Sequence, residues 1–216
     1  MVTSRIARMP RDQRRAQLLE AANDVFTTKG YHAAAMDDIA EVAGVSKPVL
    51  YQHFGSKLDL YLDLLDLSCE RLVEEVEEAL SSTTDNADRV VATMGAFYEF
   101  VSSSRGKFRF VFESDLTGDG AVQQRLWRVN DEIANAIAEV ISEDTDLPPA
   151  QAKLLGISLV GIAQVSARYW VSAGPERVAL DDAKELVSSL AWRGLRGFPR
   201  VEHPKSPAED VSTLTA

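Results

Sequence analysis

The chain has 216 residues, enough for one large domain or for a small domain joined to a larger one. Its net charge is −10, and its single cysteine, Cys69, excludes an intrachain disulfide and a cluster of thiolate metal ligands. No uncharged apolar run reaches the length of a membrane span, and the first ten residues lack the apolar core of a secretory signal, so we expect a cytoplasmic protein. Apolar residues recur every three or four positions, which predicts an all-α protein of about nine helices.

Charge is distributed unevenly along the chain. Residues 1–57 contain eight Lys and Arg against six Asp and Glu, whereas residues 58–216 contain 15 against 27. Lys and Arg that neutralise phosphates supply most of the non-specific affinity for nucleic acid, so an acidic chain would not normally bind it. The asymmetry predicts a neutral-to-basic head, able to approach DNA, and an acidic body.

In chain order, the first helix is predicted from Pro10 to Lys29. Arg11, Arg14 and Arg15 lie in its first turns, where cations oppose the helix dipole, so we expect them to serve a contact outside the helix. Residues 1–10 add further arginines and are predicted to form a flexible basic arm that reaches phosphates or an adjacent minor groove. A solvated, disordered tail is the alternative.

The stretch AGVSKPVLYQHFGSK, residues 43–57, interrupts the helical pattern with two glycines and a proline. Gly44 allows the left-handed turn that ends a short helix predicted over 36–43. Ser46 is the expected N-cap of the next helix, with its side-chain oxygen accepting backbone N–H groups. Pro48 falls in the first turn of that helix, where its missing N–H has no helical partner.

The helix predicted over 47–53 is too short to be stable by itself and needs anchors from its neighbours. Val45, Leu50 and Phe54 lie on one side and are the expected anchors. The other side consists of Lys47, Pro48, Val49, Tyr51, Gln52 and His53. Two short helices joined by such a turn form a helix-turn-helix, whose second helix enters the major groove of DNA. An αα-corner with an ordinary polar face is the alternative interpretation.

The remaining helices are predicted over residues 56–80, 87–103, 107–116, 121–142, 149–171 and 180–197. The segment 107–116 alternates like a strand, but a lone strand has no partner, so we predict a helix. The helix over 149–171 is apolar nearly all round, which predicts burial on every side. Residues 198–216 are polar and rich in proline and are expected to be disordered.

The segment GYHAAAMDDIAEVAGVSKPVLYQHFGSKLDLYLDLL, residues 30–65, resembles the DNA-binding domain of the TetR family of bacterial transcriptional regulators. The resemblance extends over residues 11–66 and implies an N-terminal helix-turn-helix domain, here 11–57, joined by a long fourth helix to a helical effector-binding and dimerisation domain, here 58–197. Many members carry Ser or Thr just before the second helix, where this chain has Ala34 and Ala35. That difference removes a cap and a possible phosphate contact.

The resemblance implies a homodimer that presents two recognition helices to an inverted-repeat operator in double-stranded DNA. It assigns phosphate contacts to Ser46, Tyr51 and Lys57, and it leaves Lys47, Pro48, Val49 and Gln52 to face bases. The predicted DNA-binding residues are Arg11, Ser46, Lys47, Pro48, Val49, Tyr51, Gln52, His53 and Lys57. Gln52 could pair with adenine, whereas Pro48 and Val49 can make only apolar contacts, such as one with a thymine methyl.

Family members respond to a small molecule in the helical body, and apolar and aromatic side chains line most such pockets. The predicted effector-binding residues are Phe97, Phe100, Val101, Phe108, Phe112, Trp127, Leu159, Ala163, Tyr169 and Trp170. An ordinary packed core is the alternative for each of them. Arg125 and Arg128 are among the cations that could receive a phosphorylated head group.

The phrases GVSKPVLYQHF, LSSTTDN, FRFVFESDL and SARYW resemble a TetR subgroup that regulates fatty-acid synthesis and senses long-chain acyl-CoA. We therefore expect a hydrophobic effector of this kind. The alternatives are a regulator of drug efflux or catabolism that senses an aromatic or cationic compound, and a small-molecule-binding protein without DNA activity.

The dimer surface is expected on the last two helices, with Gly156 and Gly161 allowing close approach and Trp192 as an anchor. Packing within one chain is the alternative. The histidines are scattered and form no catalytic or metal-spaced set, so we expect no enzyme activity, no metal and no cofactor.

Overall fold

The computed structural model describes residues 9–103, 116 and 118–194, and within these ranges the chain is helical, as predicted. The elements are α1 (Arg11–Ala33), α2 (Met36–Val42), α3 (Lys47–His53), α4 (Lys57–Ser81), α5 (Asn86–Ser103), α7 (Gly120–Asp144), α8 (Pro149–Ser172), the short 3₁₀ turn η1 (Gly174–Glu176) and α9 (Leu180–Arg193). The helix predicted over 107–116, most of the basic arm and the C-terminal tail lie outside the described residues.

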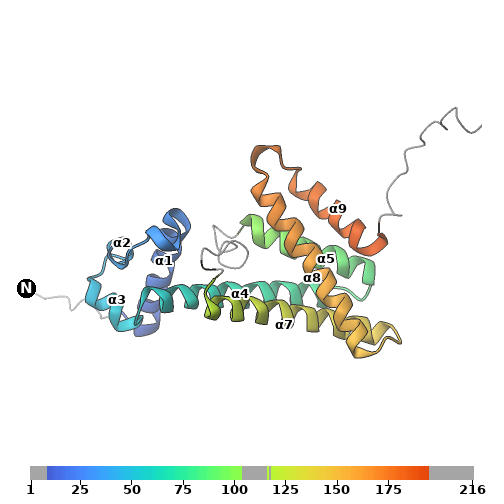
Figure 1. Cartoon of the computed structure of the whole chain (residues 1–216), viewed down its shortest axis with the longest axis horizontal. Helices are drawn as coiled ribbons and strands as arrows, with labels where there is room; N and C mark the ends of the chain where they lie inside the picture. Colours follow the sequence, from blue (N-terminus) through green and yellow to red (C-terminus); the bar gives the residue numbers. More distant parts are fainter. Residues whose placement is uncertain (1–8, 104–115, 117, 195–216) are drawn as a thin grey trace, which may run out of the picture.

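Helices α1, α2 and α3 form a head at one end of α4 (Figure 1). Helices α5 and α7 pack along the rest of α4, and α8 and α9 complete a larger body. Within the body, α7 packs against α4 and α8, and α5 packs against α4, α8 and α9. Helix α4 therefore belongs to both parts. The domain boundary placed after residue 57 stays a prediction.

Helix α1 is longer than predicted by one turn. Gly30 has φ 75° and ψ 165°, which breaks the helix near its predicted end, but the chain resumes a helical turn as far as Ala33. A positive φ of this kind is open to glycine and rarely to other residues. The kink directs Tyr31 back onto Phe26, whose ring centroid is 5.9 Å away.

The turn between α2 and α3 has the predicted form. Gly44 has φ 65°, the Gly44 N–H donates to the Glu41 carbonyl at 3.0 Å, and the Val45 N–H donates to the Ala40 carbonyl at 3.0 Å. These two bonds and the left-handed glycine make a Schellman motif, which satisfies the last carbonyls of a helix.

Ser46 occupies the predicted N-cap position of α3, but its side chain makes no capping hydrogen bond, so that part of the prediction is wrong. Capping side chains bond the N–H of the second or third helical residue. The second residue here is Pro48, which has no N–H, and the third, Val49, already donates to the Ser46 carbonyl at 2.9 Å. The Ser46 hydroxyl therefore stays on the exposed surface of the head.

Ala35 precedes α2 and cannot cap it with a side chain. Asp38 nevertheless accepts a hydrogen bond from the Ala35 N–H at 3.1 Å, which is the acidic half of a capping box. Lys29 lies 2.9 Å from Asp38 and, with the Ala35 bond, lowers the pKa of its carboxyl group.

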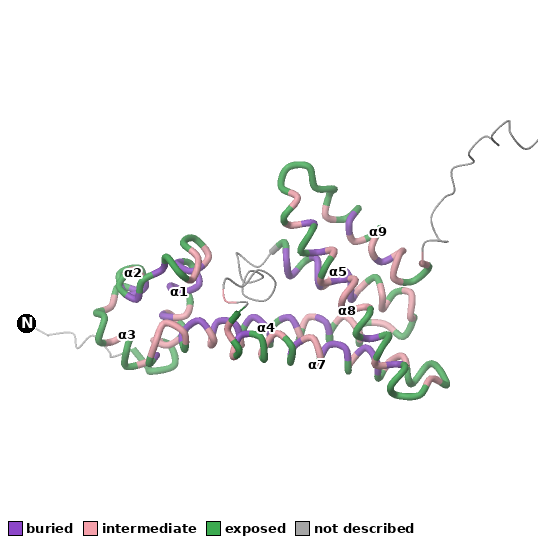
Figure 2. Tube along the Cα trace, in the orientation of Figure 1, coloured by how far each residue is buried: buried purple, intermediate pink, exposed green. Residues whose placement is uncertain are grey.

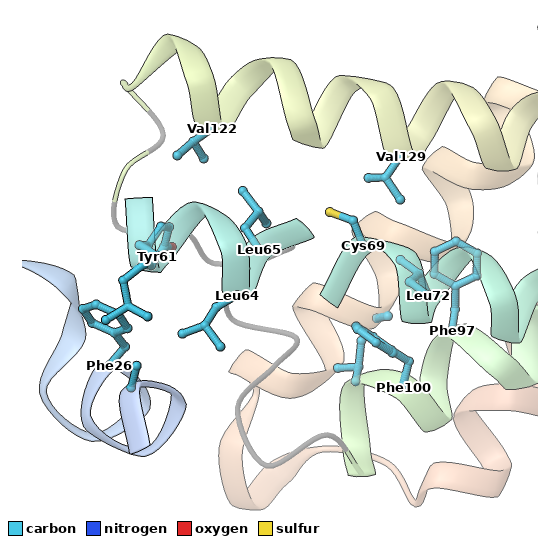
Figure 3. Close-up of a cluster of buried hydrophobic side chains, with 14 of the residues drawn as sticks. Phe26, Tyr61, Leu64, Leu65, Cys69, Leu72, Phe97, Phe100, Val122 and Val129 are labelled. Atoms are coloured by element: carbon cyan, nitrogen blue, oxygen red, sulfur yellow. The ribbon is translucent and has the colours of Figure 1, made fainter. Parts of the chain in front are cut away.

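One connected apolar core runs from the head into the body through α4. Figure 3 shows Phe26 of α1 against Tyr61 of α4, with ring centroids 5.5 Å apart, and Leu65, Cys69 and Leu72 continuing the same row into the body. Burial raises the pKa of the Cys69 thiol to about 12, which keeps it protonated and unreactive. The head and body are thus joined by packing as well as by the chain.

Helix α8 is not buried on every side, contrary to the prediction. Five of its large apolar residues are exposed in a single chain, namely Leu154, Leu155, Ile157, Val165 and Tyr169. Figure 2 shows exposed stretches along α8. An isolated helix pattern cannot tell burial within one chain from burial against another copy. By length and composition alone α8 is long and apolar enough to cross a membrane, a property that it shares with core helices of soluble proteins.

Candidate DNA interface and effector cavity

The short helix α3 presents its predicted outer face to solvent and its predicted inner face to the core. Leu50 and Phe54 are 0% and 2% exposed, and Val45 packs against the core from the turn. On the outer side Ser46, Lys47, Pro48, Tyr51 and Gln52 are exposed, and Val49 and His53 are partly buried. The anchoring prediction is confirmed. A two-turn helix held this way can present side chains to a DNA groove.

Lys47 stands at the start of α3 and pairs with Asp37 of α2, with a nitrogen–oxygen distance of 3.0 Å. The hydrogen bond and the charge of Asp37 raise the pKa of Lys47. Both side chains are more than half exposed, so the pair is screened by water and easily exchanged. A phosphate or a base edge can therefore replace Asp37 as the partner of Lys47.

His53 lies at the other end of α3, beside the arginines of α1. Burial lowers the pKa of His53, and the charges of Arg11, Arg15 and Arg14 lower it further. Basic side chains from the N-terminus of α1 thus lie near the C-terminal end of the recognition helix. The contact with DNA that these arginines were expected to serve stays a prediction.

Arg15 also holds the head to α4. Its guanidinium pairs with Asp63 of α4 and lies 4.6 Å from the centroid of the Phe54 ring, directly after α3. One side chain therefore connects α1, the end of α3 and α4. Cation–π contacts and charge-assisted hydrogen bonds are both directional, so this contact restrains how α3 is presented.

Lys57, predicted to contact a phosphate, points into the head. Its ammonium donates to the carbonyls of Tyr31 and Ala34 at 2.8 and 2.9 Å and lies 4.3 Å from the centroid of the Tyr31 ring. These bonds tie the beginning of α4 to the segment between α1 and α2. The phosphate contact itself stays a prediction.

Five of the ten residues of the predicted effector site are core residues. Those that are 5% exposed or less are Phe97, Phe100, Val101, Ala163 and Trp170. Trp170 packs edge-on against Tyr98 and donates from its ring nitrogen to the Val178 carbonyl at 2.8 Å. For these five residues, the structure supports the packed core given as the alternative.

The other predicted effector residues are scattered. Trp127 and Tyr169 are 70% and 74% exposed and lie on the outer surface of the body. Phe108 and Phe112 lie outside the described residues. Arg125 and Arg128, proposed for a head group, are both held by Asp66 of α4, at 2.9 and 3.4 Å. Leu159 remains, and it lines a cavity.

This cavity, of about 520 Å³, is lined by residues from the end of α4, the first half of α5, the end of α7, α8 as far as Ile162 and the last turn of α9. Figure 1 shows these parts of the helices at the end of the body farthest from the head. The lining residues are Leu80, Asn86, Arg89, Val90, Thr93, Met94, Ile137, Val140, Ile141, Asp144, Thr145, Leu155, Ser158, Leu159, Ile162, Ala191 and Trp192. Its lining is predominantly apolar, with a few polar groups, and its size suits a small molecule. Leu155 and Trp192 are exposed, which places the mouth of the cavity beside α8 and α9.

Sequence reasoning missed this cavity because it looked for aromatic side chains. The apolar part of the lining is aliphatic except for Met94 and Trp192, and the lining residues are spread over five helices. The sequence did not indicate that polar residues such as Arg89 and Thr93 line a cavity, since single polar residues in an amphipathic helix usually face solvent.

Comparison with known proteins agrees with this geometry. Residues 18–64 match the family model of bacterial regulatory proteins of the tetR family. Over 192 residues the chain is 43% identical to the HTH-type transcriptional activator FasR of Mycolicibacterium smegmatis. The aligned region covers 89% of this chain and 87% of FasR.

Two solved structures show how far the fold extends. A TetR-like transcriptional regulator from Rhodococcus sp. RHA1 has a TM-score of 0.66 at 30% identity and covers 88% of this chain and 100% of that chain. FadR of Bacillus subtilis, solved in complex with stearoyl-CoA, has a TM-score of 0.70 at 18% identity and covers 83% of this chain and 98% of that chain. The second likeness concerns the fold alone.

The family model covers the head, and the similarity to FasR continues through the body. These relatives are regulators and not enzymes. The chain therefore belongs to the tetR family of bacterial regulatory proteins and is a DNA-binding transcriptional regulator.

Proposed function

We propose that the protein binds an inverted-repeat operator as a homodimer in the cytoplasm and releases or engages it in response to a long-chain acyl-CoA. The observation that carries the DNA part is the outer face of α3. Most of its outer edge is exposed to solvent, while Leu50 and Phe54 anchor the helix to the head from behind.

A dimer is needed because one short recognition helix reads only a few base pairs. The two helices of a dimer reach successive major grooves when they are about 34 Å apart. The exposed apolar residues of α8 and α9 that do not line the cavity supply a surface for a second copy; they are Leu154, Ile157, Val165, Tyr169 and Leu186. Contiguous exposed apolar surface of this kind is typical of protein interfaces.

Three observations support an acyl-CoA effector. The body contains a largely aliphatic cavity of about 520 Å³. The sequence resembles the subgroup that senses long-chain acyl-CoA. A protein of the same fold was solved with stearoyl-CoA. Each buried CH₂ contributes about 0.8 kcal/mol, so a long chain can bind tightly in such a lining.

The effector can act only through its differential affinity for two arrangements of the heads. A coupling of about 1–3 kcal/mol between effector and operator sites is enough for a change of about 5- to 150-fold in DNA affinity. Helix α4 is the element that spans both sites, since it packs against α1 in the head and reaches the cavity at Leu80.

The test is footprinting of the dimer on genomic fragments at two salt concentrations, with and without palmitoyl-CoA. We expect one protected palindromic site, a steep loss of affinity with salt and a shift of at least about fivefold with the acyl-CoA. Equal binding to all fragments would refute the operator proposal. Specific operator binding whose affinity does not change with palmitoyl-CoA would refute only the proposal of an acyl-CoA effector.

A further inference from the structure

Thr93 lines the cavity with a buried hydroxyl group that has no hydrogen-bond partner in the chain. It lies on α5, is 4% exposed, and its hydroxyl oxygen makes no hydrogen bond to the chain. Buried hydroxyl groups nearly always have a partner, and an unmet one destabilises the fold. A threonine within a helix can bond the carbonyl one turn earlier, and this one does not. The hydroxyl is therefore available to a molecule in the cavity.

Several other polar side chains of the lining already have partners within the chain. Arg89 donates to the Thr83 carbonyl at 3.0 Å and to Asn86 at 2.9 Å, and it pairs with Asp144 at 3.2 Å. The hydroxyls of Thr145 and Ser158 donate to carbonyls of their own helices at 2.6 and 2.8 Å. Among the buried side-chain nitrogen and oxygen atoms of the described lining, the Thr93 hydroxyl is thus the one that has no partner within the chain.

The lining also offers no unpaired charge. Arg89 is the one cation among the described residues that line the cavity, and the carboxylate of Asp144 neutralises it. A buried carboxylate needs a cation or several donors, because desolvation of an unpaired charge is strongly unfavourable. A neutral carbonyl oxygen needs only one donor. The cavity therefore favours an esterified acyl chain over a free fatty acid.

We propose that this cavity is the effector site and that it binds a long acyl chain as a neutral ester or thioester, whose carbonyl oxygen accepts a hydrogen bond from the Thr93 hydroxyl. This inference rests on the acyl-CoA part of the proposed function. The apolar lining takes the chain, and the head group leaves at the mouth beside Leu155 and Trp192. Thr93 is then a residue that determines effector specificity.

Calorimetric titration of the full-length protein with palmitoyl-CoA, palmitate and coenzyme A, the two lipids below their micelle concentrations, tests the chemistry. We expect palmitoyl-CoA to bind and palmitate to bind at least about tenfold more weakly, since its carboxylate finds no free cation. Coenzyme A alone should not bind. Equal affinity for palmitate and palmitoyl-CoA would overturn the assignment of a neutral carbonyl.

Four variants test the location. Thr93→Val keeps the shape and removes the hydroxyl, and we expect it to weaken palmitoyl-CoA by about three- to tenfold. Thr93→Ser keeps the hydroxyl and should stay within about twofold of the wild type. Val90→Trp fills the cavity and should abolish binding, whereas Val91→Trp, on the neighbouring exposed position, is its matched control and should bind normally.

A stability measurement separates ligand recognition from structure. Without ligand, Thr93→Val should unfold at the same temperature as the wild type or higher, because it removes a buried hydroxyl that has no partner. A variant that is at least as stable yet binds more weakly has lost a ligand contact. If Thr93→Val unfolds earlier, the hydroxyl has a structural role and the inference is wrong.

The two proposals fail in different ways. If the wild type binds no acyl-CoA, the effector proposed above is wrong and this site falls with it. If the wild type binds palmitoyl-CoA and all four variants bind it equally, the effector proposal stands and the cavity is not its site. Operator binding without ligand confirms that each variant is folded.

Discussion

Lys47 and Lys57 flank the recognition segment, and their partners give them different roles. Lys47 pairs with Asp37 on the exposed outer surface, whereas Lys57 donates to two backbone carbonyls beneath the head. The resemblance to the TetR family predicts DNA contacts for both lysines. Sequence spacing alone does not tell in which direction a lysine side chain points. Salt dependence can tell the two roles apart, since each phosphate contact changes the slope of affinity against salt.

We expect Lys57→Met to reduce the folding free energy by about 1–3 kcal/mol, because two charge-assisted hydrogen bonds are lost. Operator affinity should fall, but the slope of log K against log salt should stay at the wild-type value. Urea unfolding and fluorescence anisotropy at four salt concentrations measure both quantities.

Lys47→Met is the control for this variant. Its slope should decrease by about 0.9 if Lys47 contacts one phosphate, and its folding free energy should hardly change, since its ion pair is exposed. A decrease in slope for Lys57→Met, with unchanged stability, would contradict the positioning role of Lys57.

His53 makes folding depend on pH in a known direction. Burial and three arginines lower its pKa below the usual 6.5 in the folded chain, so the unfolded chain takes up the proton first as the pH falls. The His53 contribution to stability is therefore present above about pH 6.5 and is lost as the pH decreases below it. Unfolding in urea at pH 7.5 and 5.5 measures this loss.

In His53→Gln the difference in folding free energy between these two pH values should be smaller than in the wild type. On an operator, phosphates would offset the arginine charges and raise the pKa of His53 again, so binding should take up a proton and strengthen as the pH decreases. An operator affinity with the same pH dependence in wild type and His53→Gln would argue against a phosphate near this residue.

At the scale of elements, α8 carries two glycines with opposite surroundings. A Cβ on Gly156 would lie 2.4 Å from the Ala134 carbonyl oxygen of α7, whereas a Cβ on Gly161 would meet nothing within 4 Å. Of the two, Gly156 thus allows close packing within the chain, and Gly161 lies on the open side of the helix. The close approach expected at Gly156 is therefore made to α7 of the same chain. The close approach expected at Gly161, in the dimer, stays a prediction.

Gly156→Ala should destabilise the protein by about 1–3 kcal/mol, because α7 and α8 must separate. Gly161→Ala, the same change five residues later, should leave the stability of a single chain unchanged or raise it by up to about 1 kcal/mol through better helix propensity. Thermal unfolding of both variants at low protein concentration compares them. Equal destabilisation would show that the α7–α8 contact at Gly156 is not tight.

The lengths and ends of the elements follow local chemistry closely enough to be read from the chain. Gly44 and Pro48 place the turn and the start of α3 because left-handed backbone and a missing N–H are properties of single residues. Ser56 caps α4, and its side-chain oxygen accepts from the Asp59 N–H at 3.0 Å. Ser46 does not cap α3, because the identity of the second helical residue removed its partner. A side-chain cap therefore depends on the N-cap residue and also on the helical residue whose N–H it would bond.

At the scale of the molecule, the apolar faces of α8 and α9 remain uncovered in a single chain, and the proposed dimer would bury them. We expect Leu154→Glu combined with Val165→Glu to yield a monomer in analytical ultracentrifugation and to lose most operator affinity, because two linked half-site contacts become one. Helical content should be unchanged.

Val91→Glu is the control for this variant, since Val91 is 56% exposed on α5 and lines a polar groove with Arg71 and Glu75 of α4. It should remain dimeric and bind the operator normally. A double variant of α8 that stays dimeric would place the interface on another surface of the body.

The sequence by itself determined the helical class, the helix-turn-helix and the outward edge of α3, because periodicity, glycine turns and proline positions act within a few residues. Only the tertiary structure decided which aromatic residues fill the core, that Lys57 points inward, and that an aliphatic cavity with Thr93 lies at the far end of the body. These features arise where side chains from helices far apart in the sequence meet. Packing and desolvation at such a meeting point depend on the relative placement of whole helices, which no local pattern contains.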